Sequence, residues 1–170
     1  MTSEWHSSHI VAPKRGQLIR DYVLLDAAGK TVQLTDFRGK WNLLIVLLPS
    51  ALDAQQTQLL QSLAEKSSQV RENETRVLVV TRPEHLATVV NLGDDFLVLS
   101  DSNGSALLEL AAFEAPVFYI TDKFREVLHR IDVHEQHPLP SAEELVSWTE
   151  FAAMQCPECH PPEWPADEAA

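Results

Sequence analysis

The stretch Asn42-Leu43-Leu44-Ile45-Val46-Leu47-Leu48-Pro49 decides the fold. Its aliphatic run, Leu43 to Leu48, has none of the polar alternation of a strand with one face in water. A short, wholly apolar run indicates a strand that is buried on both faces, as in the centre of a parallel sheet. Proline cannot donate a hydrogen bond to a strand ladder, so Pro49 ends the run. We therefore predict that residues 42–48 form the central strand of an α/β domain.

Strand and helix patterns alternate on both sides of this run. A hairpin is expected before it, with strands at 22–25 and 31–34 and a tight turn at Gly29. Alternation of this kind is typical of a sheet with helices on both faces, and a short turn between the last two strands makes the sheet mixed. The further predicted strands are 76–80, 96–99, 116–120 and 126–133. The predicted helices are 53–70, 83–91, 106–113 and 141–152.

Charge and composition exclude several classes of function. The chain has 170 residues, 25 of them acidic and 13 basic, which gives a net charge of -12. Such a surface repels phosphate backbones and anionic lipid, so we expect neither a nucleic acid nor a membrane as partner. The longest aliphatic run is far shorter than the ~20 residues of a membrane helix.

The length of the chain and the positions of its prolines and glycines suggest one domain with two flanking segments. We predict a polar lead-in at 1–16, a single domain at 17–154 and a proline-rich, acidic tail at 155–170. The N-terminal segment lacks the apolar core of a signal peptide, so we expect a cytoplasmic protein whose thiols are mostly reduced. No glycine-rich phosphate-binding loop occurs, and we expect no cofactor.

Three segments, taken in order, resemble a known family. They are Asp26 to Trp41 (DAAGKTVQLTDFRGKW), Leu99 to Gly104 (LSDSNG) and Ala115 to Asp122 (APVFYITD). Together they resemble the alkyl hydroperoxide reductase/thiol-specific antioxidant family, the peroxiredoxins, over residues 16–152. The resemblance implies a thioredoxin-like sandwich with a central mixed sheet flanked by helices, a redox or antioxidant role, and a cis peptide bond between Ala115 and Pro116.

The chemistry of that family does not carry over to this sequence. Peroxiredoxins place a threonine four residues after a proline, and the attacking cysteine three residues further on. Counted from Pro49, these positions hold Asp53 and Gln56. The thioredoxin register, Ser50 to Asp53, contains no cysteine either, and no arginine lies in the strand beginning at Pro116. We therefore expect no peroxidase activity at the usual site, and we interpret Asp53 as a helix cap.

Both cysteines lie in the tail, in Gln155-Cys156-Pro157-Glu158-Cys159-His160. Two residues between Cys156 and Cys159 allow the sulfurs to meet, so the pair could cycle between dithiol and disulfide. These two are the candidate catalytic residues. Cys156 follows a helix C-terminus and is close to Glu158, and both features disfavour a thiolate. We expect a slow, unactivated thiol.

Other interpretations of the cysteine pair stay open. Cys-x-x-Cys is half of a zinc site, which His160, or His134 and His137, could complete if the chain folds back or if a second subunit contributes. The five residues from Cys156 to His160 also fit the attachment pattern of c-type haem, although covalent haem attachment implies export. A fourth interpretation gives the cysteines no chemistry at all.

Two functional hypotheses follow from the sequence. The first is a thiol–disulfide oxidoreductase that keeps a peroxiredoxin-like scaffold and carries its cysteines at the C-terminus. The second is a non-catalytic interaction module, in which the surface beside Pro116 binds a partner and the tail is a zinc or structural element. The partner is a protein or a thiol substrate, and a homodimer is compatible with either hypothesis.

Overall fold

The computed structural model describes residues 11–89 and 91–155, and its centre is a mixed sheet in the order β2-β1-β5-β4-β3-β6-β7. The strand β3 pairs in parallel with β4 and antiparallel with β6, which confirms the predicted central position of the apolar run. The strands are β1 Val23–Leu25, β2 Thr31–Gln33, β3 Asn42–Leu48, β4 Thr75–Thr81, β5 Phe96–Ser100, β6 Val117–Thr121 and β7 Val127–Asp132.

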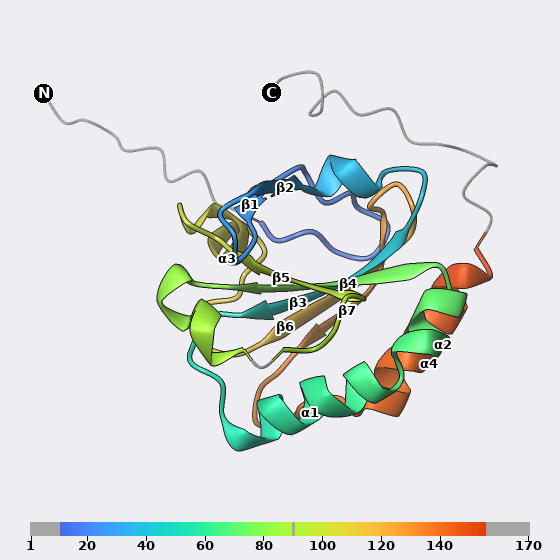
Figure 1. Cartoon of the computed structure of the whole chain (residues 1–170). Helices are drawn as coiled ribbons and strands as arrows, with labels where there is room; N and C mark the ends of the chain where they lie inside the picture. The colour runs from blue at the N-terminus through green and yellow to red at the C-terminus, as the bar shows by residue number, and fades with distance from the viewer. Residues whose placement is uncertain (1–10, 90, 156–170) are drawn as a thin grey trace, which may run out of the picture.

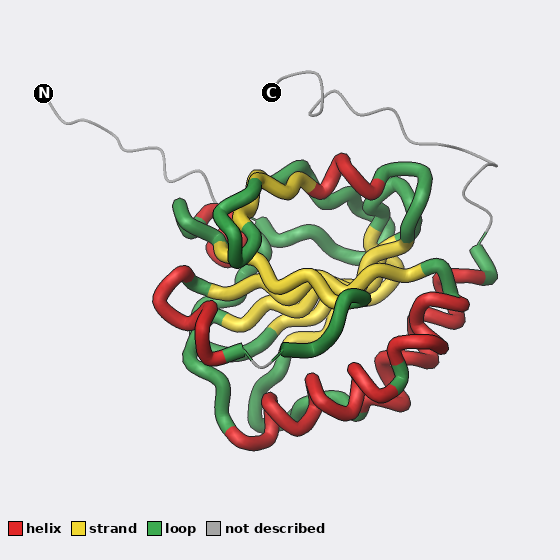
Figure 2. The backbone as a smooth tube through the Cα atoms, viewed as in Figure 1, coloured by secondary structure: helices red, strands yellow, loops and turns green. Residues whose placement is uncertain are grey.

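The longer helices cover one face of the sheet, and the β1–β2 hairpin with α3 covers the other (Figures 1 and 2). None of the helices in the described part of the chain has the length and apolar character that a bilayer span requires. The α-helices are α1 Ala54–Glu65, α2 Ser67–Glu72, α3 Ser105–Glu109 and α4 Ala142–Ala153, and two 3-10 helices are η1 Leu34–Phe37 and η2 Pro83–Thr88.

Every residue of β3 is buried, because the strand contributes to two separate cores. Leu44 and Val46 pack beneath α1 and α4, whereas Leu43 and Ile45 pack beneath the hairpin and α3. Successive side chains of a strand point to opposite faces, so an apolar residue is needed at every position and not at every second one.

Two predicted helix starts are confirmed by their caps. The Asp53 carboxylate accepts a hydrogen bond from the Gln56 backbone N–H at 2.7 Å, at the start of α1. The Ser141 hydroxyl accepts from the Glu144 N–H at 3.1 Å, at the start of α4. Each cap satisfies one of the backbone donors that the first turn of a helix leaves free.

Three of the four predicted helical segments differ from the structure, whereas α4 at Ala142–Ala153 agrees with the predicted 141–152. The segment expected at 53–70 is divided at Lys66, which caps both α1 and α2 and leaves the helical region of backbone conformation with φ -100° and ψ 14°. The helix expected at 83–91 is the 3-10 helix η2, which contains no buried residue. Because this segment has no apolar face to bury, packing does not stabilise a longer α-helix here.

The helix expected at 106–113 ends at Glu109 instead. Ala111 has φ 61°, in the left-handed region that glycine usually occupies at a helix end. The Ala112 N–H donates to the Leu107 carbonyl at 2.8 Å and the Ala111 N–H donates to the Leu108 carbonyl. These two bonds make a Schellman motif, which stops the helix without a glycine.

The segment before β1 is paired to the far edge of the sheet. The Gly16 N–H donates to the Val127 carbonyl and the Val127 N–H donates to the Gln17 carbonyl, both at 2.8 Å. Arg125, which is 1% exposed, donates from Nε to the Ile19 carbonyl at 2.9 Å. These bonds hold residues 16–19 beside the start of β7.

We expect Leu78→Ala to lower the free energy of unfolding by about 2–5 kcal/mol, as truncation of a fully buried leucine does. Leu78 lies in the middle of β4 and is 0% exposed. Leu108→Ala is the matched control, because Leu108 is 51% exposed, and it should change stability by no more than about 0.5 kcal/mol. Urea unfolding measures both, and equal losses would contradict the two-core arrangement.

The turn between β6 and β7 contains a buried carboxylate that should make stability depend on pH. Asp122 accepts from the N–H groups of Phe124 at 2.8 Å and Glu126 at 3.0 Å. Burial raises the pKa of this carboxyl above its usual range, and these two hydrogen bonds oppose the rise. A raised pKa favours the protonated form in the folded state. The contribution of the Asp122 carboxyl to the free energy of unfolding is therefore complete below the unfolded-state pKa. This contribution is lost as the pH rises through the folded-state pKa.

We expect Asp122→Asn to keep both hydrogen bonds without the buried charge. The stability of the asparagine variant relative to the natural protein should therefore increase from pH 3 to pH 7. Asp122→Ala should lose about 1–3 kcal/mol across this range, because both acceptor bonds disappear. Denaturant unfolding at several pH values measures this. A difference in the free energy of unfolding between the asparagine variant and the natural protein that stays constant with pH would contradict the prediction.

Candidate functional site

The carboxyl end of β3 is where the resemblance would place an active site. Pro49 follows the strand, and its carbonyl accepts from Arg82 Nε at 2.9 Å. The Ser50 hydroxyl donates to the Glu114 carbonyl at 3.3 Å, and Asp53 caps α1. Gln56 lies in the first turn of that helix, half-buried. The loop is therefore fixed on both sides, but it contains no thiol, and Ser50 has no adjacent base among these contacts.

Pro116 lies next to this end of β3, because β6 pairs with it antiparallel and Val117 faces Leu47. The Ala115–Pro116 peptide bond is trans, since the described residues contain no cis bond, so the expected cis bond is wrong. Trans is the ordinary state of an X–Pro bond, and the Pro116 carbonyl accepts from the Val133 N–H at 3.2 Å. This bond extends the β6–β7 pairing beyond the two strands.

A groove beside Pro116 has an apolar rim and acidic neighbours. Phe113, which is 60% exposed, lines it together with Val117. Among the described residues that line this groove, Glu114 and Asp132 are the charged ones, and both are acidic. The absence of a cation agrees with the sequence, which has no arginine in this strand. The described residues that line this groove therefore offer no cation to a thiolate.

The candidate catalytic residues Cys156 and Cys159 lie outside the described residues, as does His160. The described chain ends at Gln155, immediately after α4. Gln155 lines a small cavity with Asn42, Glu74 and Lys123. Asn42 is the first residue of β3, so α4 delivers the chain to the amino end of that strand. This is the opposite end of the sheet from Pro49.

In the part of the chain that the structure describes, the charged residues that line this cavity are Glu74, Asp122 and Lys123. Lys123 Nζ lies 2.9 Å from Glu74 Oε2, so the lysine charge is already offset. The buried carboxyl of Asp122 lines the same cavity. The C-terminus of α4 adds the negative end of the helix dipole. The last described residue of the chain therefore lies beside one ion pair, one buried carboxyl and the negative end of a helix dipole.

The structure places His134 and His137 together in the turn after β7. Their backbones exchange hydrogen bonds of 3.0 and 2.9 Å, and their rings meet edge to face at 4.7 Å. This turn lies before α4, a helix of 12 residues and about 18 Å, whereas Gln155 lies after it. No group of three or more metal-binding side chains occurs within 11–89 and 91–155. A zinc site therefore needs ligands from outside this part.

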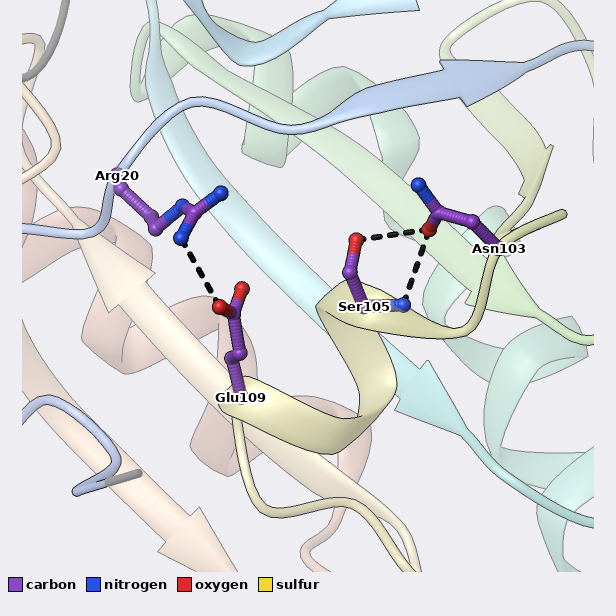
Figure 3. Close-up of polar contacts among 4 residues, drawn as sticks. All are labelled: Arg20, Asn103, Ser105 and Glu109. Atoms are coloured by element: carbon purple, nitrogen blue, oxygen red, sulfur yellow. Dashed lines mark hydrogen bonds and ion pairs between the residues drawn. The ribbon is translucent and has the colours of Figure 1, made fainter. Parts of the chain in front are cut away.

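A polar cluster that the sequence analysis missed joins the N-terminal segment to α3. Arg20 Nη1 lies 2.9 Å from Glu109 Oε1, as Figure 3 shows, and these residues are 89 positions apart. The Arg20 guanidinium also lies 5.3 Å from the centre of the Tyr22 ring. No local spacing connects the members, so no sequence pattern could have found them.

The contacts of this cluster indicate a structural role, which is to link the N-terminal segment to α3. Burial raises the pKa of the Tyr22 hydroxyl above its usual range, and the facing Glu109 carboxylate raises it further. Tyr22 therefore stays protonated at neutral pH and is a poor acid. Nearby, Asn103 Oδ1 accepts from the Ser105 N–H at 3.0 Å and from the Ser105 hydroxyl at 2.7 Å, which fixes the start of α3 (Figure 3).

Comparison with known proteins supports the fold. No protein-family model and no curated protein matches the chain. Among solved structures, it is similar to the peroxidoxin BcpB from Mycobacterium tuberculosis, with a TM-score of 0.67, 16% identity, and coverage of 84% of this chain and 99% of that one. For the reduced 2-Cys peroxiredoxin of Plasmodium vivax these values are 0.66, 17%, 89% and 90%.

A third similar structure is not named as a peroxiredoxin. It is a putative thiol:disulfide interchange protein DsbE from Chlorobium tepidum, with a TM-score of 0.64, 17% identity, and coverage of 84% of this chain and 99% of that one. At these identities the likeness establishes architecture. The chain has a thioredoxin-like α/β fold of the kind found in peroxiredoxins.

Proposed function

We propose that this protein is a thiol–disulfide protein that acts through Cys156 and Cys159 and is not a peroxidase. One observation carries the proposal. The chain has a thioredoxin-like fold and two cysteines, and both lie in Cys-Pro-Glu-Cys while the carboxyl end of β3 has none. Serine, aspartate and glutamine cannot cycle between thiol and disulfide, so dithiol chemistry in this chain requires the tail.

The proposed reaction is exchange with a disulfide of a protein or small-molecule substrate. One tail thiol, as its thiolate, attacks a sulfur of the substrate disulfide and forms a mixed disulfide, and the other substrate sulfur leaves as a thiolate. The second tail thiolate then attacks the mixed disulfide. The tail ends as a disulfide, and the substrate gains two electrons and two protons and leaves as a dithiol.

The described geometry supports a site at the amino end of β3. Cys156 is bonded to Gln155, so their Cα atoms are about 3.8 Å apart. A strand of seven residues such as β3 spans about 20 Å between its first and last Cα atoms. The first cysteine therefore cannot take the place of a thiol beside Pro49 in the same chain. In the proposed function the tail provides its own reaction site.

The alternative is a non-catalytic interaction module, and exposed apolar surface favours it. Phe113 is 60% exposed at the rim of the groove beside Pro116, and Leu108 is 51% exposed on the neighbouring helix. Exposed apolar patches often mark protein contacts. In this alternative the cysteines hold zinc, with ligands from the tail or from a second subunit, or have a purely structural role.

Thiol counting before and after mild oxidation separates the two functions. The proposal predicts that an oxidised dithiol reagent removes two thiols per chain, and that dithiothreitol restores both. Cys156→Ser and Cys159→Ser are matched controls, and each should prevent the intramolecular disulfide. Stoichiometric zinc in the same sample, or two thiols that ignore the oxidant, would support the alternative instead.

The rate of exchange should increase with pH. Because the α4 C-terminus and its acidic neighbours disfavour a thiolate, we expect the reaction with an uncharged disulfide to be slow at pH 7 and to accelerate through about pH 8.5. Stopped-flow measurement from pH 6 to 10 tests this. A fast reaction that is independent of pH above 6 would show an activated thiol and contradict the assigned environment.

Hydrogen peroxide consumption should be no faster in the natural protein than in the double variant Cys156→Ser/Cys159→Ser. The reason is that no cysteine lies at the carboxyl end of β3, where the threonine and cysteine positions of the family hold Asp53 and Gln56. A peroxidase assay with a thioredoxin-based reducing system measures this. Rapid consumption that survives Cys156→Ser would overturn the assignment.

A further inference from the structure

One surface groove has a charge opposite to that of the whole protein. It lies along β7 and is lined by Lys14, Arg15, His129, Arg130 and Asp132. The chain carries a net charge of -12, yet this groove contains three permanent cations and one carboxylate. The concentration of positive charge is a property of the fold, because the cations come from two segments more than 100 residues apart.

Packing holds the two β7 residues of the groove in place. The His129 ring stacks on Trp148 of α4, with ring centres 3.7 Å apart and planes at 13°. Arg130, on the opposite face of the strand, has its guanidinium 5.5 Å from the centre of the Tyr119 ring. Arg130 Nη2 also donates to Asp132 Oδ1 at 2.7 Å. The charges of Arg130 and Asp132 therefore offset each other.

The other two cations are presented by a turn that is fixed to the same strand. The Lys14 N–H donates to the Gln17 side-chain oxygen at 2.8 Å, and the Gln17 N–H donates to the Lys14 carbonyl at 2.9 Å. The Gly16 N–H binds the Val127 carbonyl. Lys14 and Arg15 are exposed, and no ion pair with a carboxylate is seen for either within the described residues.

We propose that this groove binds an oxyanion, a phosphate or carboxylate group held between Lys14 and Arg15 on one side and His129 on the other. With Arg130 offset by Asp132, Lys14 and Arg15 leave an excess of two positive charges. Burial lowers the pKa of His129 and Arg15 lowers it further, whereas Glu144 on α4 opposes both. The imidazole is therefore neutral at pH 7 and contributes a single N–H donor. This site is independent of the cysteine chemistry.

Two sources can supply the oxyanion. One is a free small anion or a phosphorylated metabolite. The other is a carboxylate of this chain, since the tail after α4 carries no lysine or arginine but four acidic residues, Glu158, Glu163, Asp167 and Glu168. Both sources use the same recognition by cations and N–H donors. Phosphate titration of the natural chain and of a chain with a neutralised tail distinguishes a free anion from a tail carboxylate.

The test is a titration of the full chain with inorganic phosphate at low ionic strength, followed by NMR of the His129 ring and the Trp148 indole. Phosphate should shift both signals, because these rings stack and His129 lines the groove. Lys14→Gln/Arg15→Gln should weaken phosphate binding by at least about tenfold, because both cations that lack a carboxylate partner are removed. Lys30→Gln/Lys40→Gln removes the same charge from two other exposed positions and should leave the affinity unchanged.

A second arm identifies the source when the natural chain does not respond. In the full chain with Glu158→Gln, Glu163→Gln, Asp167→Asn and Glu168→Gln, phosphate binding should then appear, which would show that the tail carboxylates occupy the groove. Equal affinity in the Lys14→Gln/Arg15→Gln and Lys30→Gln/Lys40→Gln variants would overturn the proposal, because it would mean diffuse attraction only. No binding in either the natural or the tail-neutralised chain would also overturn it.

Discussion

The burial of β3 on both faces is the constraint on which the rest of the structure depends. A strand with six consecutive aliphatic residues cannot face water on either side, so the chain must build a layer on each. On one side α1, α2 and α4 supply it, and on the other side the hairpin and α3 do. The parallel pairing with β4 follows from the helical crossover that provides the first of these layers.

The same constraint divides the molecule into two chemically different ends. At the carboxyl end of β3, hydrogen bonds from the Ser50 and Arg82 side chains to backbone carbonyls, together with the Asp53 cap, fix the loop that a thioredoxin-like enzyme would use for chemistry. At the amino end, α4 brings the chain to a polar cavity between Glu74, Lys123 and the buried Asp122. In the proposed function, dithiol chemistry thus moves from the carboxyl end of β3, beside a helix N-terminus, to the amino end, beside a helix C-terminus. The helix dipole presents its negative end there.

Sequence patterns predicted the strands well because their information is local. The aliphatic runs at β3, β4 and β5 lie within one or two residues of the predicted bounds, and so do the two strands that follow. The first and third helices were predicted to continue further, because Lys66 and Ala111 end them through backbone geometry that carries no glycine or proline signal, whereas the last helix agrees with its prediction. The trans bond before Pro116 shows that resemblance over a short segment does not determine the local isomer.

The functional groups were harder to predict because they depend on long-range contacts. Arg20 meets Glu109, and the turn at Lys14 meets β7, only after the sheet has formed. What a sequence can supply in such cases is the residue type and the overall charge, and here the strong excess of acid concealed a local excess of base. A net charge is an average over the surface, whereas binding is determined by the few charges within a Debye length of the ligand.

This uneven charge has a consequence for the proposed chemistry. The amino end of β3 presents Glu74, Asp122 and the negative end of α4, and Lys123 offsets one of these charges. A disulfide substrate with acidic groups would be repelled there and attracted to the groove along β7, where Lys14 and Arg15 lie. A neutral or cationic disulfide would meet no such barrier. For the proposed thiol exchange, this distribution of charge favours neutral or basic disulfide partners.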